Sequence, residues 1–121
     1  MTRFKAQGFT STFKNARKGF RLVLKSEMNI RIHIVISFFV MLSAYLLNFS
    51  STEFCILLLT IAMVIVSEML NTAIEFTLDS IYHNKYSRMV GMAKDISAGA
   101  VMFASVIAIL IGLFLFGRHL L

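Results

Sequence analysis

The sequence contains no proline, and its single cysteine is Cys55. One cysteine cannot close an internal disulfide, so cysteine usage indicates no particular redox compartment. The sequence also has no Gly-x-x-x-x-Gly-Lys-Ser/Thr loop, no Gly-x-Gly-x-x-Gly turn and no cluster of cysteine and histidine. Any nucleotide chemistry must therefore use scattered cations and a metal held by carboxylates.

Polar and charged residues are too scarce for a soluble domain of 121 residues. Hydrophobic residues make up 58% of the chain, and the mean hydropathy is +0.80. Three apolar runs, 32–49, 54–70 and 96–116, approach or exceed the roughly 17 to 25 residues that cross a bilayer core. The composition therefore predicts an all-α integral membrane protein.

The basic residues are divided unevenly along the chain. Of twelve Lys and Arg, eight precede or start the first apolar run, three lie between the second and third, and Arg118 lies near the end. The positive-inside rule then places the N-terminus in the cytoplasm and the C-terminus outside. The net charge of +6 favours anionic headgroups or nucleotide phosphates as partners. Nucleic acid is disfavoured as a partner, because these cations adjoin membrane spans.

Apolar residues recur at helical spacing before the first span, between Phe9 and Val23, and basic residues form a separate stripe. This pattern predicts an amphipathic helix on the membrane surface over about 9–26. It serves either as an anchor alone or also as a contact for nucleotide phosphates. Membrane helices are expected over about 29–49, 53–81 and 93–117, so that 1–121 is a single membrane domain.

Four of the six acidic residues fall between positions 68 and 95. In a helix, Glu68, Asn71, Glu75 and Asp79 share one face with Thr72. A carboxylate near lipid is costly unless it meets a cation, a metal or water, so these acids are functional candidates.

The depth of these groups in the membrane points to one site. Glu68 lies fifteen residues after Glu53, roughly 23 Å along a helix, which places Glu68 near the inner interface of a core about 30 Å thick. Glu75 lies two turns further on. The polar groups at the start of the first and third spans fall at a similar depth; they are Glu27, Arg31, Lys94 and Asp95.

These residue types suit phosphoryl transfer, which needs charge neutralisation, alignment and a proton acceptor. Glu27 and Glu75 could hold Mg²⁺ through oxygen ligands. Glu68 could accept a proton from an alcohol, and Lys94 could offset phosphate charge. Glu27 and His33 also have a plainer interpretation as interfacial anchors at the end of a span.

The third apolar run carries a stripe of small residues, which lets helices approach closely. The stripe consists of Ser97, Ala100, Ala104, Ala108 and Gly112. It predicts a helix-packing surface within one chain or between chains.

The run Glu68-Met-Leu-Asn-Thr-Ala-Ile-Glu75, followed by Asp79, Ala93-Lys-Asp95 and Ala98-Gly-Ala-Val101, resembles the signature of the small bacterial diacylglycerol kinases and undecaprenol kinases. The resemblance extends from about 13 to 116. It implies a homotrimer of three-span subunits, each with an N-terminal surface helix, whose active sites are shared between subunits.

The resemblance also implies roles for single residues. Glu68 matches the catalytic base, and Glu27 and Glu75 match the glutamates that hold the metal. The positions around the nucleotide are Asn71, Lys94, Asp95 and Tyr86.

Two departures from the Gram-negative diacylglycerol kinases matter. His33 stands where those enzymes have a glutamate, a pattern that looks like the Gram-positive undecaprenol kinases. The loop Lys85-Tyr86-Ser87 replaces their Glu-Tyr-His, so that Tyr86 alone is carried over as a nucleotide contact.

The expected function is that of an ATP- and Mg²⁺-dependent lipid kinase in the bacterial plasma membrane. Arg31, His33 and Glu68 are the expected lipid-binding residues. Undecaprenol is the first choice of acceptor and diacylglycerol the second. A small transporter or accessory protein is the competing class, but a transporter would need its carboxylate near the bilayer centre, whereas these acids gather at one face.

Overall fold

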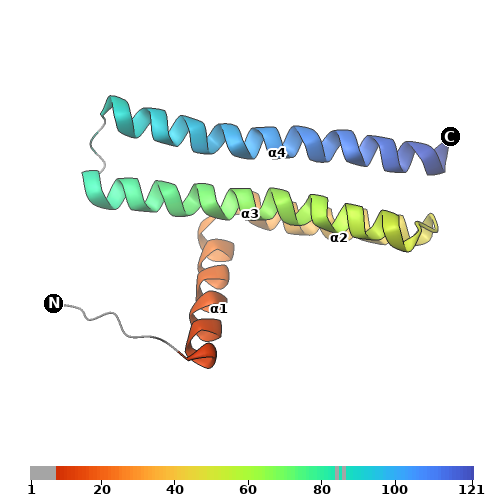
Figure 1. Cartoon of the computed structure of the whole chain (residues 1–121), viewed down its shortest axis with the longest axis horizontal. Helices are drawn as coiled ribbons and strands as arrows, with labels where there is room; N and C mark the ends of the chain where they lie inside the picture. Colours follow the sequence, from red (N-terminus) through yellow and green to blue (C-terminus); the bar gives the residue numbers. More distant parts are fainter. Residues whose placement is uncertain (1–7, 84, 86) are drawn as a thin grey trace.

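The computed structural model describes residues 8–83, 85 and 87–121, and the described residues form four α-helices with short connections (Figure 1). The helices are α1 (Phe9–Ser26), α2 (Met28–Leu46), α3 (Ser51–Tyr82) and α4 (Arg88–Leu120). α2, α3 and α4 are long and apolar enough to cross a membrane. The all-helical fold with three candidate spans predicted from the apolar runs is confirmed.

The helix ends differ from the apolar runs because polar residues cap them. α2 ends at Leu46, before the expected end at 49, and Asn48 adopts a left-handed φ of 62° in the turn. α4 begins at Arg88, ahead of the expected start at 93, because the Ser87 side chain accepts a hydrogen bond from the Val90 N–H at 3.2 Å.

α3 begins with a capping box. The Glu53 N–H donates to the Ser50 side chain at 3.2 Å, and the Ser50 N–H donates to the Glu53 carboxylate at 2.9 Å. The other carboxylate oxygen of Glu53 lies 2.8 Å from Nε2 of His119, at the end of α4. Glu53 therefore both starts α3 and ties α4 to it.

An apolar cluster holds the three long helices together at this same end. Its buried members are Ala44, Phe49, Leu57 and Leu115. The Phe49 ring stacks on the His119 ring at 4.4 Å between centroids and packs against Phe116 at 4.9 Å. Aromatic and aliphatic packing thus fixes the end of the bundle that carries the α2–α3 turn and the C-terminus.

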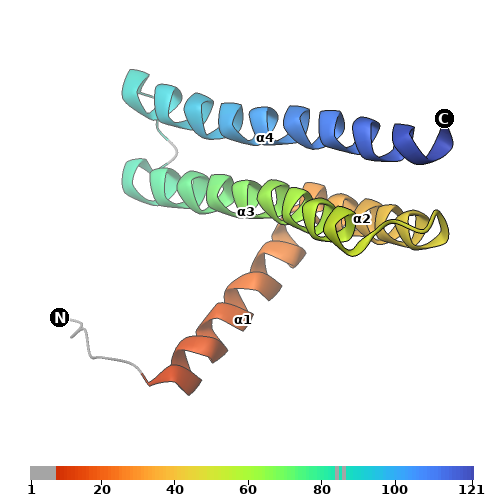
Figure 2. The ribbon, with the colours of Figure 1, turned by 45° about the vertical axis from the view of Figure 1, so that its right-hand side comes forward.

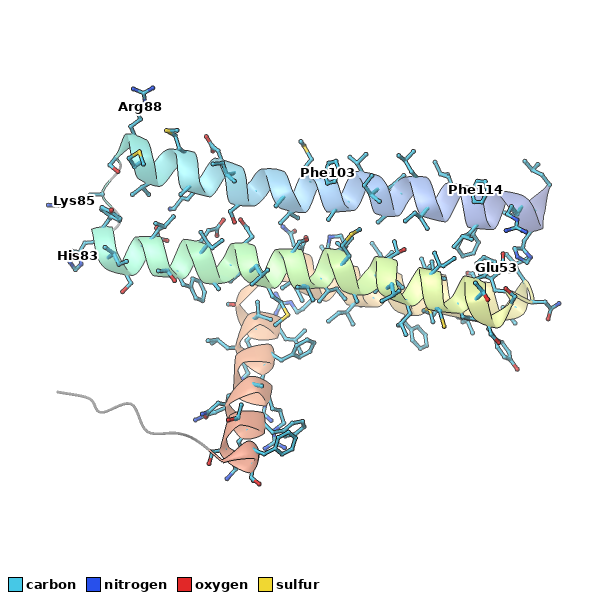
Figure 3. All side chains as sticks on the ribbon, in the orientation of Figure 1. Glu53, His83, Lys85, Arg88, Phe103 and Phe114 are labelled. Carbon is cyan, nitrogen blue, oxygen red and sulfur yellow. The ribbon has the colours of Figure 1, made fainter. Side chains whose placement is uncertain are left out.

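The opposite end of the bundle is longer and more polar. α3 and α4 lie side by side and continue past the start of α2, while α1 leaves the bundle at a steep angle near that level (Figures 1 and 2). His83, Lys85 and Arg88 lie at this end, far from Glu53 (Figure 3). The side chains of α1 are exposed except at Val23 and, in part, Leu24. Its role as an amphipathic surface helix stays a prediction.

The buried stripe of α3 changes character along its length. Leu57, Thr60 and Val64 are buried toward the apolar end, and Glu68 and Thr72 continue the same stripe toward the polar end. Because these positions are three or four residues apart, they face the same neighbours. The stripe therefore carries a carboxylate into the space between the helices.

Candidate functional site

Glu68 is a buried carboxylate with one partnered oxygen. The residue is 8% exposed, and its Oε1 lies 3.0 Å from Nε2 of His33 on α2. Its Oε2 is buried and has no hydrogen-bond partner among the described residues. A buried carboxylate oxygen without a partner is rare, because it loses hydration without compensation. Oε2 is therefore suited to accept a proton or a hydrogen bond from a bound molecule.

A polar cavity of about 200 Å³ adjoins Glu68. Glu27 and Asn29 line it from the α1–α2 junction, Asn71 from α3, and Ala98 from α4. Glu27 has an extended backbone between the two helices (φ −118°, ψ 111°), where it ends α1 and begins α2. The break between α1 and α2 thus brings Glu27 to the same cavity as Glu68.

Asn71 connects Glu75 to α4 through its side-chain amide. The Ser97 hydroxyl donates to Asn71 Oδ1 at 2.6 Å, and Asn71 Nδ2 donates to Glu75 Oε1 at 3.3 Å. Ser97 is 7% exposed. The small-residue stripe assigned Ser97 to packing alone and missed this contact. The signal that could have found it is the one hydroxyl among alanines and a glycine.

An apolar groove of about 380 Å³ lies on the other side of the His33–Glu68 pair. His33 lines one end of it, and the rest is lined by apolar and small side chains of α2, α3 and α4, among them Val40, Val64, Ala108 and Phe116. His33 thus borders the apolar groove while its partner Glu68 borders the polar cavity.

Lys94 and Asp95 lie in a second polar cavity, of about 260 Å³. Lys94 Nζ donates to Asp79 Oδ1 at 2.7 Å, which links α4 to α3, and Lys85 lines the same cavity. Asp79 follows Glu75 by one helical turn, about 5.4 Å. The two polar cavities are therefore neighbours along the α3–α4 pair.

The structure brings most of the predicted site residues to these two cavities and separates others. Glu27, Glu68 and Asn71 share one cavity, with Glu75 bonded to Asn71. Arg31 is exposed and is absent from the described residues that line the cavities. Tyr86 lies outside the described residues.

The carboxylate oxygens at the first cavity are of the kind that bind a magnesium ion. Mg²⁺ is usually bound by one or two carboxylates together with waters and substrate phosphates. Glu27 supplies a carboxylate there, and the partnerless Oε2 of Glu68 is a further acceptor. Among the described side chains no group of three or more His, Cys, Asp or Glu is placed to hold a metal. The assignment of Glu27 and Glu75 to Mg²⁺ therefore stays a prediction.

Comparison with known proteins identifies relatives over most of the chain. A protein named diacylglycerol kinase from Synechocystis sp. is 33% identical over 101 residues, which are 84% of this chain and 58% of that protein. This chain therefore spans a little over half the length of that relative. A protein named undecaprenol kinase from Bacillus subtilis is 35% identical over 108 residues, which are 89% of this chain and 87% of that protein.

The family model described as prokaryotic diacylglycerol kinase matches residues 14–116. This range contains all of α2 and α3, α4 as far as Phe116, and every site residue predicted from the sequence. The family predicted from the run Glu68–Glu75 is confirmed. The chain belongs to the prokaryotic diacylglycerol kinase family.

Proposed function

We propose that the chain is a lipid kinase that transfers the γ-phosphate of ATP to the hydroxyl of a membrane lipid, with Mg²⁺ as cofactor. Membership of a family of prokaryotic lipid kinases supports this assignment. The observation that carries it is the position of Glu68, buried between a polar cavity and an apolar groove with one carboxylate oxygen left without a partner. At this boundary, the hydroxyl of a lipid in the apolar groove can meet a phosphate in the polar cavity.

Glu68 is the proton acceptor in this reaction. As the lipid oxygen forms its bond to the γ-phosphorus and the bond to ADP breaks, the hydroxyl proton moves to Oε2 of Glu68. His33 holds Oε1 at 3.0 Å, so that the carboxylate keeps one orientation during the transfer. The nucleotide lies along the two polar cavities, where Lys94 offers two further N–H donors beyond the one used by Asp79.

Magnesium, when bound, would offset the negative charge of the phosphates. Glu27 and Glu75 are the proposed ligands, and Asn71 fixes Glu75 through its amide. Asp95 lines the second cavity and belongs to the nucleotide end of the site.

Undecaprenol is the proposed acceptor. The fuller coverage of the Bacillus undecaprenol kinase supports it. The apolar groove also supports undecaprenol as the acceptor. The groove begins at His33, and its wall on α4 extends from Ser105 to Phe116, which is roughly 16 Å of helix. Undecaprenol carries its hydroxyl on a single chain that can enter such a groove. Diacylglycerol, which carries two chains, is the alternative, and the Synechocystis relative favours it.

The proposed assembly is a homotrimer in the bacterial plasma membrane, with active sites shared between subunits and the N-terminus in the cytoplasm. Large apolar side chains remain exposed along all three spans, including Phe39, Leu59 and Phe103, and can face lipid or another subunit. A mixture of Glu68→Gln and Lys94→Ala subunits tests whether one subunit supplies both residues to a site, in which case no site in the mixture is intact and activity stays absent. If a site takes these residues from different subunits, about a quarter of the sites in a random mixture are intact and activity returns.

The test of the function is a parallel assay of purified protein with undecaprenol and diacylglycerol, following labelled phosphate from ATP into lipid. Glu68→Gln should lower turnover by about 10²- to 10⁴-fold, the usual contribution of a general base, while the protein stays folded. Glu53→Gln is the matched control, because it removes a carboxylate from the opposite end of the same helix. Absence of lipid-dependent ATP consumption would instead favour a transporter or accessory protein.

A further inference from the structure

The Ser97 hydroxyl makes a different kind of contact from the hydroxyls of five other residues in the described helices. Ser37, Thr60 and Thr77 each donate to the backbone carbonyl four residues earlier in their own helix, and Ser43 and Ser67 also bond within their helices. Such bonds satisfy a hydroxyl locally without specifying a neighbour. Ser97 instead donates across the α3–α4 interface to a side chain at the candidate site, at 2.6 Å.

The chemistry of the three partners fixes the orientation of the Asn71 amide. The Glu75 carboxylate can only accept hydrogen bonds, so the NH₂ group of Asn71 must face it. Oδ1 of Asn71 then faces Ser97, which must donate. With the amide rotated by half a turn, Oδ1 would meet the carboxylate oxygen of Glu75 and two acceptors would be in contact. Glu75 thus sets which way the amide faces, and Ser97 supplies the donor that satisfies Oδ1 and holds the amide in that orientation.

Asn71 also lines the polar cavity beside Glu68. One N–H of its NH₂ group bonds to Glu75, and the second remains for a bound molecule. A donor is the group that a phosphate oxygen requires, whereas a carbonyl oxygen would repel it. The rotamer held by Ser97 thus presents a donor to the cavity and keeps Glu75 Oε1 oriented at the same time.

We propose that Ser97 is a positioning residue for the nucleotide and its metal: by donating to Asn71 Oδ1 from α4, it holds the amide so that N–H groups face Glu75 and the cavity. This inference rests on the proposed function. Ser97 touches neither substrate; it acts through Asn71. Its loss should affect the binding of ATP with its metal and leave the KM for the lipid unchanged, because the lipid groove is lined by other residues.

The expected size of the effect follows from one buried hydrogen bond. Ser97→Ala leaves Oδ1 of Asn71 without this donor, and we expect kcat/KM for ATP to fall by about tenfold, the effect of losing roughly one such bond. Ser97→Thr keeps a hydroxyl and should restore most of the loss. Ser97→Cys keeps a weak donor of similar size and should lie between the two.

A binding measurement provides a readout besides activity. Mn²⁺ in place of Mg²⁺, together with a non-hydrolysable ATP analogue, is titrated into each full-length protein in detergent and followed by electron paramagnetic resonance. The apparent Kd for Mn²⁺ should rise by about tenfold in Ser97→Ala and stay near the wild-type value in Ser97→Thr. Ser43→Ala is the matched control, since its hydroxyl bonds within α2 at an exposed position.

The inference is supported if both the Mn²⁺ affinity and kcat/KM for ATP decrease in the order wild type, Ser97→Thr, Ser97→Cys, Ser97→Ala. Thermal unfolding midpoints confirm that each variant is folded. Equal Mn²⁺ affinities in wild type and Ser97→Ala would overturn it, as would equal losses in the Ala and Thr variants. If Ser97→Ala does not fold, the Cys and Thr variants decide by the same comparison. A wild-type protein without lipid-dependent ATP turnover would refute the proposed function, and the Mn²⁺ titration would still test Ser97.

Discussion

Replacing His33 by leucine isolates the electrostatic contribution of the pair that it forms with Glu68. Leucine keeps an apolar side chain of similar size at the mouth of the groove but cannot donate to a carboxylate. Both oxygens of Glu68 would then lack a partner in a position where the side chain is only 10% exposed. The variant should therefore be less stable than the wild type because it retains an uncompensated buried charge.

The size of the loss depends on how well water screens the pair. Removing one partner of a fully buried ion pair costs about 3–5 kcal/mol. The His33 side chain is 34% exposed, so water reaches one side of this pair, and the cost should be smaller. We expect about 2 kcal/mol, within the range for leaving one buried polar group unsatisfied.

A double-mutant cycle with Glu68→Gln separates this charge effect from packing. Reversible unfolding in mixed micelles, followed by circular dichroism, gives the free energy of unfolding of the wild type, both single variants and the double variant. Glutamine is neutral, so His33→Leu should cost little in the Glu68→Gln background, and the coupling energy should exceed 1 kcal/mol. A coupling energy below about 0.5 kcal/mol would mean that the two residues do not interact, and the reasoning fails.

Three further predictions concern single contacts. Lys94→Ala should raise the KM for ATP by about tenfold, because a charge-assisted hydrogen bond to the nucleotide is lost. Asp79→Asn removes the charge of the Lys94 partner but keeps an oxygen that can accept its hydrogen bond, so the KM for ATP should stay near the wild-type value. Steady-state kinetics at saturating lipid distinguishes the two variants. Ser50→Ala should lower the free energy of unfolding by about 1 kcal/mol, because it removes the side chain that begins α3. Leu57→Ala should lower the free energy of unfolding by about 2–5 kcal/mol, since Leu57 is 3% exposed in the apolar cluster. The KM for ATP should not change, because Leu57 lines the apolar groove and neither of the cavities assigned to the nucleotide. A smaller loss of stability would mean that the cluster is loosely packed.

The sequence predicts the helices well, and the start of α4 is the helix end that differs most from its prediction. Apolar runs mark the parts of α2, α3 and α4 that need lipid, so the number of spans follows directly from hydropathy. The first turn of α4, which begins at Arg88, lies ahead of the helix expected over 93–117, and the Ser87 side chain caps it. Hydropathy therefore identifies the apolar core of a membrane helix but does not detect its polar extensions.

The site was predictable where it depends on one helix. Glu68, Asn71 and Glu75 follow from helical spacing, and the structure places them on the same side of α3. The contacts of Glu68 with His33 and of Asn71 with Ser97 were not predictable in the same way. Each depends on the rotation and register of a second helix, and those quantities are set by packing along the whole interface.

The two ends of the bundle are held by different forces, and this difference bears on function. At the end near Glu53, an aromatic and aliphatic cluster packs together, and the polar contact between Glu53 and His119 adds to it. At the other end, three polar side-chain contacts join the helices beside buried apolar residues such as Ile30 and Val90. These contacts are His33 with Glu68, Ser97 with Asn71, and Lys94 with Asp79. Polar contacts at a water boundary exchange readily for contacts with water or with a bound molecule, so this end opens at lower cost. In the proposed function, a charged nucleotide would enter at that end, while the apolar end keeps the three helices in register.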